Sequence, residues 1–318
     1  MDSSATKGAA GPYAGRTFVI LNPMAGQDDL ERLRREIGGA FAARGADFDL
    51  RETTHAGHAS ELARDAAQLG YRAVCVVGGD GTLAEVATGL AGSTTPLAVV
   101  PRGTANQVAL NLKLPLDVDS AIEVAVNGLE SAIDLGCIGG RNFALVAGAG
   151  LDAAVMATAT RELKEKWGFA AYIYAAVKEA LNAAPVRFQL TADGNELEVD
   201  AVTVMVANVG ELFPGFLPIR FPLAPRPTDS WTDGLLDVIV VAPRRLPEFA
   251  TVLWNAAHKR YGVDPRLLHF QAEKITIDSL EPVPVQVDGD PAGTTPVTAS
   301  VMRRALRVLL PPESSMLT

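Results

Sequence analysis

Hydrophobic and polar positions follow two different rhythms along the chain. Up to about residue 134, short apolar runs alternate with longer segments whose apolar positions recur near a period of 3.6 residues. The apolar runs include 17–21, 73–78 and 96–100, and the helix-like segments include 30–45 and 59–70. Such alternation is typical of βαβ units, so it predicts an open, mostly parallel sheet covered by helices.

The rhythm changes after Gly136. We expect one long helix over about Leu151 to Asn182, followed by β-rich runs separated by turn residues. Asp193, Gly194 and Asn195 are typical of a hairpin turn between two of these strands. This half of the chain therefore predicts a second, largely antiparallel, β-rich domain.

These patterns divide the chain into a disordered leader and two domains. The leader is residues 1–15, the α/β domain 16–135 and the β-rich domain 136–299, while the segment 300–318 is free to pack back on the first domain.

Composition narrows the class of protein. The 318 residues are 48% apolar and carry a net charge of -9, which is typical of a globular chain and argues against a nucleic-acid binder. Cys75 and Cys137 lie in apolar runs, so we expect two buried thiols in a reducing compartment. The leader lacks the apolar core of a signal peptide, and Trp167–Leu181 is too short and too charged to span a bilayer. A cytoplasmic protein without a transmembrane segment is expected.

Three loops follow apolar strands of the first domain and precede helices. Each brings glycine or small residues to a helix N-terminus, where free N–H groups favour an anion. Singly, each is compatible with an ordinary turn between a strand and a helix; together they indicate a polyphosphate ligand at one sheet edge. The loops are Asn22–Gly26, Gly78–Thr82 and Pro101–Asn106.

Asp80 restricts the chemistry of the second loop. A carboxylate among phosphates is repelled unless a cation lies between them, so Asp80 predicts Mg²⁺ or a proton transfer involving a hydroxyl. The chain contains no Walker A motif.

Several motifs appear in the order found in one known family. They are LNPMAG (21–26), GGDGT (78–82), PRGTAN (101–106), IDLG (133–136), VAGAGLDA (146–153), TDGLLDV (232–238) and VDGD (287–290). With these motifs the chain resembles the diacylglycerol kinase and sphingosine kinase superfamily, especially its soluble bacterial lipid kinases. GGDGT alone also occurs in NAD kinases.

The resemblance implies a site for ATP between the two domains and transfer to a lipid hydroxyl. Asp290 corresponds to the catalytic base of the family, and Asp80 would organise Mg-ATP with it. A second, structural Mg²⁺ would be held by Asp233 and the backbone oxygens of Ser230 and Leu235. The positions that match ATP-binding positions are Asn22, Pro23, Met24, Ala25, Gly26, Thr54, Gly78, Gly79, Asp80, Gly81, Thr82, Glu85, Gly103, Thr104 and Asn106.

The chain departs from the family pattern at three positions. Asp290 replaces the usual Glu, which shortens the base by one methylene group. Gln107 stands where bacterial relatives often carry Asp, leaving Asp80 and Asp134 of an acidic network. Ala84 replaces a common Asn, although Glu85 is kept.

Two further segments have alternative interpretations. Gly148–Ala153 fits the G-x-G-x-x-A dinucleotide fingerprint, but it lies where the βαβ alternation stops, so close packing of a helix on a sheet is favoured. The segment 211–227 is either a loop that covers the core or an apolar entrance for a lipid chain.

The sequence thus leads to an ATP- and Mg²⁺-dependent kinase of a diacylglycerol-like or sphingoid lipid taken from a membrane surface. Peripheral contact with the inner membrane face and a homodimer are both compatible with it. The alternatives are a GGDGT-type kinase of a soluble substrate such as NAD, favoured by the shared motif, and a non-catalytic nucleotide-binding protein, favoured by Gln107 and Asp290.

Overall fold

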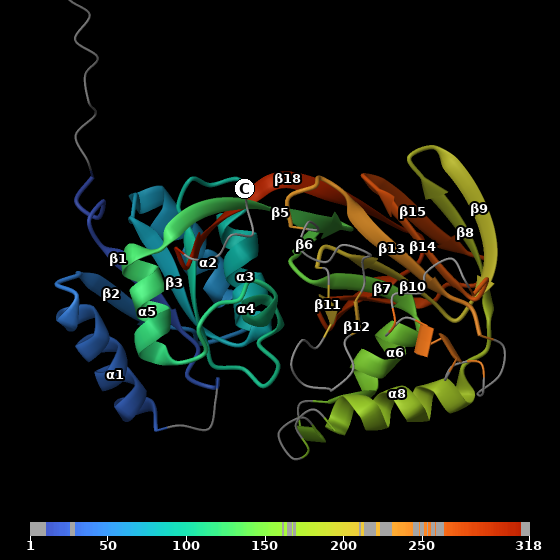
Figure 1. The fold of residues 1–318 in the computed structure, drawn as a ribbon, viewed down its shortest axis with the longest axis horizontal. Coiled ribbons are helices and arrows are strands. Elements are labelled where there is room, and N and C mark those ends of the chain that lie inside the picture. Colours follow the sequence, from blue (N-terminus) through green and yellow to red (C-terminus); the bar gives the residue numbers. More distant parts are fainter. Residues whose placement is uncertain are drawn as a thin grey trace, which may run out of the picture.

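The computed structural model has two lobes that lie side by side (Figure 1). It describes residues 11–25, 29–160, 162–163, 167, 170–209, 211–212, 221–222, 231–243, 248, 251–252, 254–255, 258 and 264–312. Of the predicted leader, residues 1–10 lie outside this set, while Tyr13 stacks on Tyr71 with a ring-centroid distance of 4.5 Å.

Four parallel strands form the centre of the first lobe, in the order β2-β1-β3-β4. The apolar runs predicted as strands form three of them, and each is buried along its whole length because helices cover both faces of the sheet. The strands are β1 (Thr17–Leu21), β2 (Phe48–Glu52), β3 (Ala73–Gly78) and β4 (Leu97–Pro101).

Helices connect these strands and pack in two pairs. The first and fifth helices contact each other, and so do the second and third. Their bounds are α1 (Leu30–Ala43), α2 (His58–Leu69), α3 (Asp80–Leu90), α4 (Gln107–Asn111) and α5 (Val118–Asn127). The mostly parallel, helix-covered sheet predicted for this half is confirmed.

A six-stranded antiparallel sheet fills much of the second lobe, in the order β14-β13-β10-β7-β16-β17. Helix α6 (Leu151–Thr158) packs on this sheet, and α8 (Ala170–Asn182) packs on α6 (Figure 1). The strands are β7 (Val146–Gly150), β10 (Thr203–Ala207), β13 (Leu236–Val241), β14 (Leu267–Ala272), β16 (Pro284–Val287) and β17 (Asp290–Thr294). The predicted β-rich, antiparallel character is confirmed.

The two lobes share one ten-stranded sheet. Strand β18 (Val297–Leu310) pairs in parallel with β4 of the first lobe and antiparallel with β15 (Lys274–Ser279) of the second. It also pairs along most of β5 (Leu129–Ile138), with an irregularity between Met302 and Leu306. The sheet ends in the predicted hairpin of β8 (Val186–Ala192) and β9 (Asn195–Ala201). The remaining strands are β6 (Arg141–Phe143), β11 (Glu211–Leu212) and β12 (Phe221–Pro222).

Two expectations differ from the structure. The predicted helix Leu151–Asn182 is interrupted, because α6 ends at Thr158 and the chain turns so that α8 packs back on it; the Thr158 hydroxyl donates to Glu179 Oε1 at 2.7 Å. Cys75 is fully buried, and burial raises the pKa of its thiol to about 12, but Cys137 is only half-buried because it lies at the end of β5. No helix in the described parts of the chain is long and apolar enough to cross a bilayer.

Candidate active site

The glycine-rich loops after β3 and β4 contact each other directly. A Cβ atom on Gly103 would lie 2.6 Å from the Cα of Gly79, so this approach requires glycine. The Arg102 N–H donates to Gly78 O at 2.8 Å, and Asn106 Oδ1 accepts the Gly103 N–H at 2.8 Å. Strand ends that are neighbours in the sheet thus present their backbone at one edge, as the sequence predicted.

Asn22 connects the loop after β1 to the same edge. Its Nδ2 donates to the Thr82 hydroxyl at 2.8 Å, while its Oδ1 accepts the Met24 N–H at 2.9 Å. Pro23 and Ala25 lie in the same turn, and the predicted site residue Gly26 lies outside the described residues. Asn22 therefore has a structural role in joining two of the predicted phosphate loops.

Thr54 and Glu85 are held by helix α2 and its preceding loop. The Thr54 hydroxyl lies 2.9 Å from His55 Nδ1 and 3.1 Å from His58 Nδ1, and the two imidazole rings stack at 4.7 Å. Glu85 accepts the N–H groups of Gly57 at 2.9 Å and Ala59 at 3.1 Å, so its carboxylate caps α2. Glu85 does not line the cavity between the lobes.

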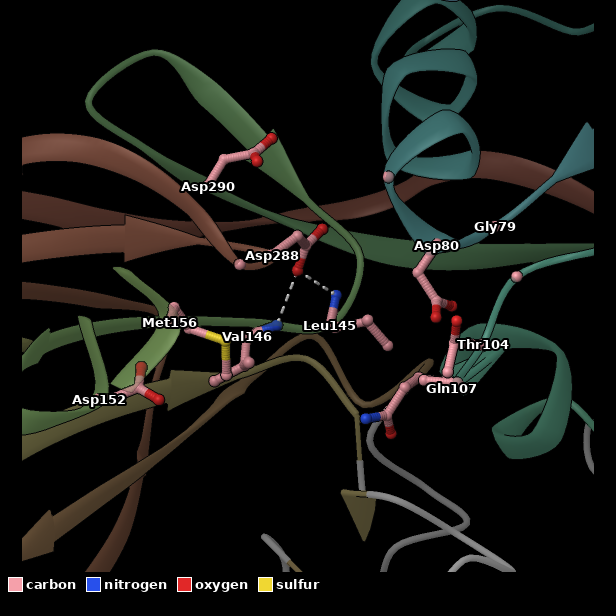
Figure 2. Close-up of a pocket in the computed structure, with 14 residues that line it drawn as sticks. Gly79, Asp80, Thr104, Gln107, Leu145, Val146, Asp152, Met156, Asp288 and Asp290 are labelled. Atoms are coloured by element: carbon pink, nitrogen blue, oxygen red, sulfur yellow. Dashed lines mark hydrogen bonds between the residues drawn. The ribbon is translucent and has the colours of Figure 1, made fainter. Parts of the chain in front are cut away.

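That cavity, of about 280 Å³, lies between the lobes (Figure 2). The first lobe contributes the glycine loops, and the second contributes the start of α6 and the β16–β17 turn. None of the described residues that line the cavity is Lys, Arg or His. The lining residues are Gly79, Asp80, Gly81, Gly103, Thr104, Ala105, Gln107, Leu145, Val146, Asp152, Met156, Asp288, Gly289 and Asp290.

Asp80 is the acid of the first lobe in this cavity. Its Oδ1 accepts the Val108 N–H at 3.2 Å, so the carboxylate caps the short helix α4 that begins at Gln107. Burial raises the pKa of Asp80, while the N–H groups of residues 106–108 counteract the rise. Gln107, at the position of the expected Asp, is buried and lines the cavity beside it.

Asp288 forms the turn between β16 and β17. Asp288 and Gly289 have positive φ angles of 48° and 92°, as in a type I′ hairpin turn. The carboxylate of Asp288 accepts N–H groups from Leu145 at 3.0 Å and Val146 at 2.9 Å (Figure 2), and from Ala144 at 2.9 Å. Burial is the main reason that its pKa is raised to about 6, and the charge of Asp80 adds to the rise.

Asp290, the predicted base, lies at the rim of the cavity. Its side chain is 74% exposed, and its Oδ2 lies 3.9 Å from Arg141 Nη2. Arg141 also donates to the backbone oxygen of Pro291 at 2.8 Å. Arg141 therefore ties the tip of the β5–β6 hairpin to the start of β17, a contact that the sequence analysis missed.

Asp152 is a further cavity acid that the sequence analysis did not select. It lies in the first turn of α6, and its Oδ2 accepts the Gln286 Nε2–H at 2.6 Å. Burial raises the pKa of Asp152 to about 6. The sequence signal for Asp152 is the glycine four residues before it. In the structure a Cβ on Gly148 would lie 1.9 Å from Asp152 Oδ2. The glycine of the apparent dinucleotide fingerprint thus makes room for a carboxylate.

The acids near the predicted structural metal lie away from the cavity. Asp233 Oδ1 accepts the Leu235 N–H at 2.9 Å, and burial raises its pKa. Asp134 accepts the N–H groups of Gly234 at 2.8 Å and Arg304 at 2.6 Å, so it joins β5 to two other segments and does not line the cavity with Asp80. Ser230 and most of 211–227 lie outside the described residues. Among the described residues, no three or more His, Cys, Asp or Glu side chains lie close enough together to hold a metal ion by themselves.

The fold and cavity define a two-lobed protein in which glycine loops of an α/β lobe face acids of a β-rich lobe. Residues 16–138 match the model of the diacylglycerol kinase catalytic domain, and 145–310 match that of the YegS C-terminal, NAD kinase β-sandwich-like domain. The chain belongs to this kinase family, and it is a kinase.

Relatives match over nearly the whole chain. A diacylglycerol kinase of Bacillus subtilis (strain 168) is 26% identical over 303 residues, covering 94% of this chain and 98% of its own. A YegS-like lipid kinase of Pseudomonas syringae pv. tomato is 28% identical, covering 95% of each chain. The crystal structure of a candidate diacylglycerol kinase from Bacillus anthracis str. Sterne superposes with a TM-score of 0.77 at 27% identity, covering 94% of this chain and 98% of its own.

Proposed function

We propose that the chain transfers the γ-phosphate of ATP, with Mg²⁺, to a hydroxyl of a diacylglycerol-like or sphingoid lipid. The observation that carries this proposal is the cavity, in which two glycine-containing loops of the first lobe lie opposite an exposed aspartate of the second. The names of the relatives support a lipid as the acceptor.

The first lobe would hold the nucleotide. Glycines 79 and 103 let the two loops pack together at the cavity, so N–H groups other than that of Gly103, which donates to Asn106, can approach phosphate oxygens. The described lining carries four aspartates and no cationic side chain, so a polyphosphate fits only together with a cation. Mg²⁺ would supply charge neutralisation of the phosphates when bound, with Asp80 as its carboxylate on the nucleotide side.

The second lobe would act on the acceptor. Asp290 has a solvent-exposed carboxylate at the cavity rim, so it can accept the proton of an entering hydroxyl. Asp288 fixes the turn that carries Asp290, because three backbone N–H groups hold its carboxylate. Asp152 and Met156 form the wall behind this position.

The proposal also assigns a role to each lobe and a second metal site. We assign the nucleotide to residues 16–135 and the lipid to 136–299, and a structural Mg²⁺ to Asp233 with the backbone of Ser230 and Leu235. We also propose that the enzyme takes its lipid from the cytoplasmic face of a membrane. A homodimer is compatible with this proposal.

A transfer assay tests the proposal. The chain is incubated with γ-labelled ATP, Mg²⁺ and separate acceptors: diacylglycerol, monoacylglycerol, ceramide, sphingosine, phosphatidylglycerol and NAD. We expect label in a lipid, and a decrease of roughly 100-fold or more in kcat for Asp290→Asn. Asp65→Asn, an exposed aspartate on α2, is the matched control and should leave kcat unchanged.

The other outcomes separate the alternatives. Label in NAD alone would identify a kinase of a soluble substrate, and label in no acceptor would favour a non-catalytic nucleotide-binding protein. Full lipid phosphorylation by Asp290→Asn would remove Asp290 as the base.

A further inference from the structure

Gln286 joins two acidic parts of the second lobe. It lies on β16, is 1% exposed, and pairs with Gly148 on β7 and with Pro291 on β17. Its Nε2 donates to Asp152 Oδ2 at 2.6 Å, and its Oε1 accepts the Gly289 N–H at 2.7 Å. The Gly289 N–H cannot accept a hydrogen bond, so it fixes which end of the amide is oxygen.

Gly148 makes this contact possible. Gly148 on β7 pairs with Gln286 on β16. A Cβ atom on residue 148 would lie 1.9 Å from Asp152 Oδ2, so only glycine leaves room for the Asp152 carboxylate beside Gln286. The carboxylate is therefore enclosed between the glycine of β7, the first turn of α6 and the amide of Gln286. A buried polar contact of this kind is costly to leave unpaired.

We propose that Gln286 is a positioning residue for phosphoryl transfer, which couples Asp152 on α6 to the turn that carries Asp290. The proposal rests on the proposed function for the role of Asp290. One amide holds the wall of the cavity with its nitrogen and the catalytic turn with its oxygen, so displacement of either end is transmitted to the other.

The charge of Asp152 determines the strength of this coupling. The other titratable groups that line the cavity are Asp80, Asp288 and Asp290, all acidic. The described lining contains no cationic side chain, and Arg141, outside the lining, lies 3.9 Å from Asp290. The Thr203 hydroxyl lies 3.4 Å from the Asp152 backbone N and gives no bond to its carboxylate. The Gln286 amide is therefore the neutral donor that favours ionised Asp152 against burial.

An isosteric substitution distinguishes coupling from packing. In Gln286→Glu, one oxygen can still accept the Gly289 N–H, but the other faces Asp152 Oδ2 and needs a shared proton. We expect kcat near the wild-type value at about pH 5.5 and a decrease of tenfold or more by pH 8, with KM for ATP within twofold. Gln286→Leu should lower kcat at every pH. Gln189→Glu, on the exposed face of β8, is the matched control and should keep the wild-type profile.

A readout without activity separates this proposal from the proposed function. In the full-length wild-type chain, the ¹⁵N shift of Gln286 Nε2 should follow the ionisation of Asp152 with a midpoint near pH 6, and Asp152→Asn should abolish that titration. This result stands whether or not the chain phosphorylates a lipid, and it needs no Gln286 variant to fold.

Two results would overturn the coupling. One is a Gln286 amide resonance that does not titrate between pH 4 and 8. The other is a folded Gln286→Glu variant whose kcat follows the wild-type pH profile.

Discussion

The aspartates of the cavity differ in the number of hydrogen bonds that each carboxylate receives. Asp288 accepts three backbone N–H groups, while Asp152 accepts one bond from Gln286. Asp290 is exposed at the rim. The motifs selected Asp80 and Asp290, but Asp152 was missed because its role depends on Gln286, which is far away in the sequence and is brought to it only by the pairing of β16 with β7.

Asp152→Asn should stabilise the chain in a pH-dependent way. The folded pKa of about 6 is above the unfolded value near 3.8, so the stability associated with this group is present below pH 4 and is lost as pH rises through 6. Asn keeps an acceptor for Gln286 without the buried charge. The gain in the free energy of unfolding should grow from a small value at pH 4 to at most about 3 kcal/mol at pH 8, because Asp152 is only partly buried and solvent screens its charge.

Urea unfolding of both proteins at several pH values measures this difference. A constant difference across pH 4–8 would contradict the buried charge at Asp152. We expect the same variant to have a lower kcat, because a more stable cavity wall is gained at the expense of activity.

At the scale of elements, apolar periodicity predicted the strands and most helices of the first lobe because each is buried in a regular way. The break between α6 and α8 was not predicted, since it depends on packing of α8 against α6. The side-chain caps of two helices were not predicted either. Asp80 and Glu85 were assigned to the nucleotide, but in the structure their carboxylates also satisfy the N–H groups at the starts of α4 and α2.

Glu85→Gln should weaken the start of helix α2. A carboxamide keeps one acceptor for Gly57 or Ala59 and presents an NH₂ group to the other N–H, so we expect a loss of about 1 kcal/mol in the free energy of unfolding. Hydrogen exchange should also become faster for the amides of residues 57 and 59. Glu196→Gln, on the exposed strand β9, is the control. Equal stability of both variants would show that the cap contributes little.

At the scale of the whole molecule, the sequence indicated an α/β lobe followed by a β-rich lobe, and both are present. It did not reveal that one sheet runs through both lobes, because strand periodicity does not specify which strands pair. Strand β18 connects β4 to β15, and Asp134 accepts backbone N–H groups from Arg304 within this strand and from Gly234. The cavity thus lies between two lobes whose relative position is set by shared strands.

A crystal structure of the chain with Mg²⁺ and a non-hydrolysable ATP analogue tests whether the cavity between the lobes is the nucleotide site. We expect the triphosphate on the backbone of Gly79–Gly81 and Thr104, with its terminal phosphate in the cavity facing the turn of Asp290. A nucleotide bound at Gly148–Ala153, or anywhere outside the cavity between the lobes, would contradict it.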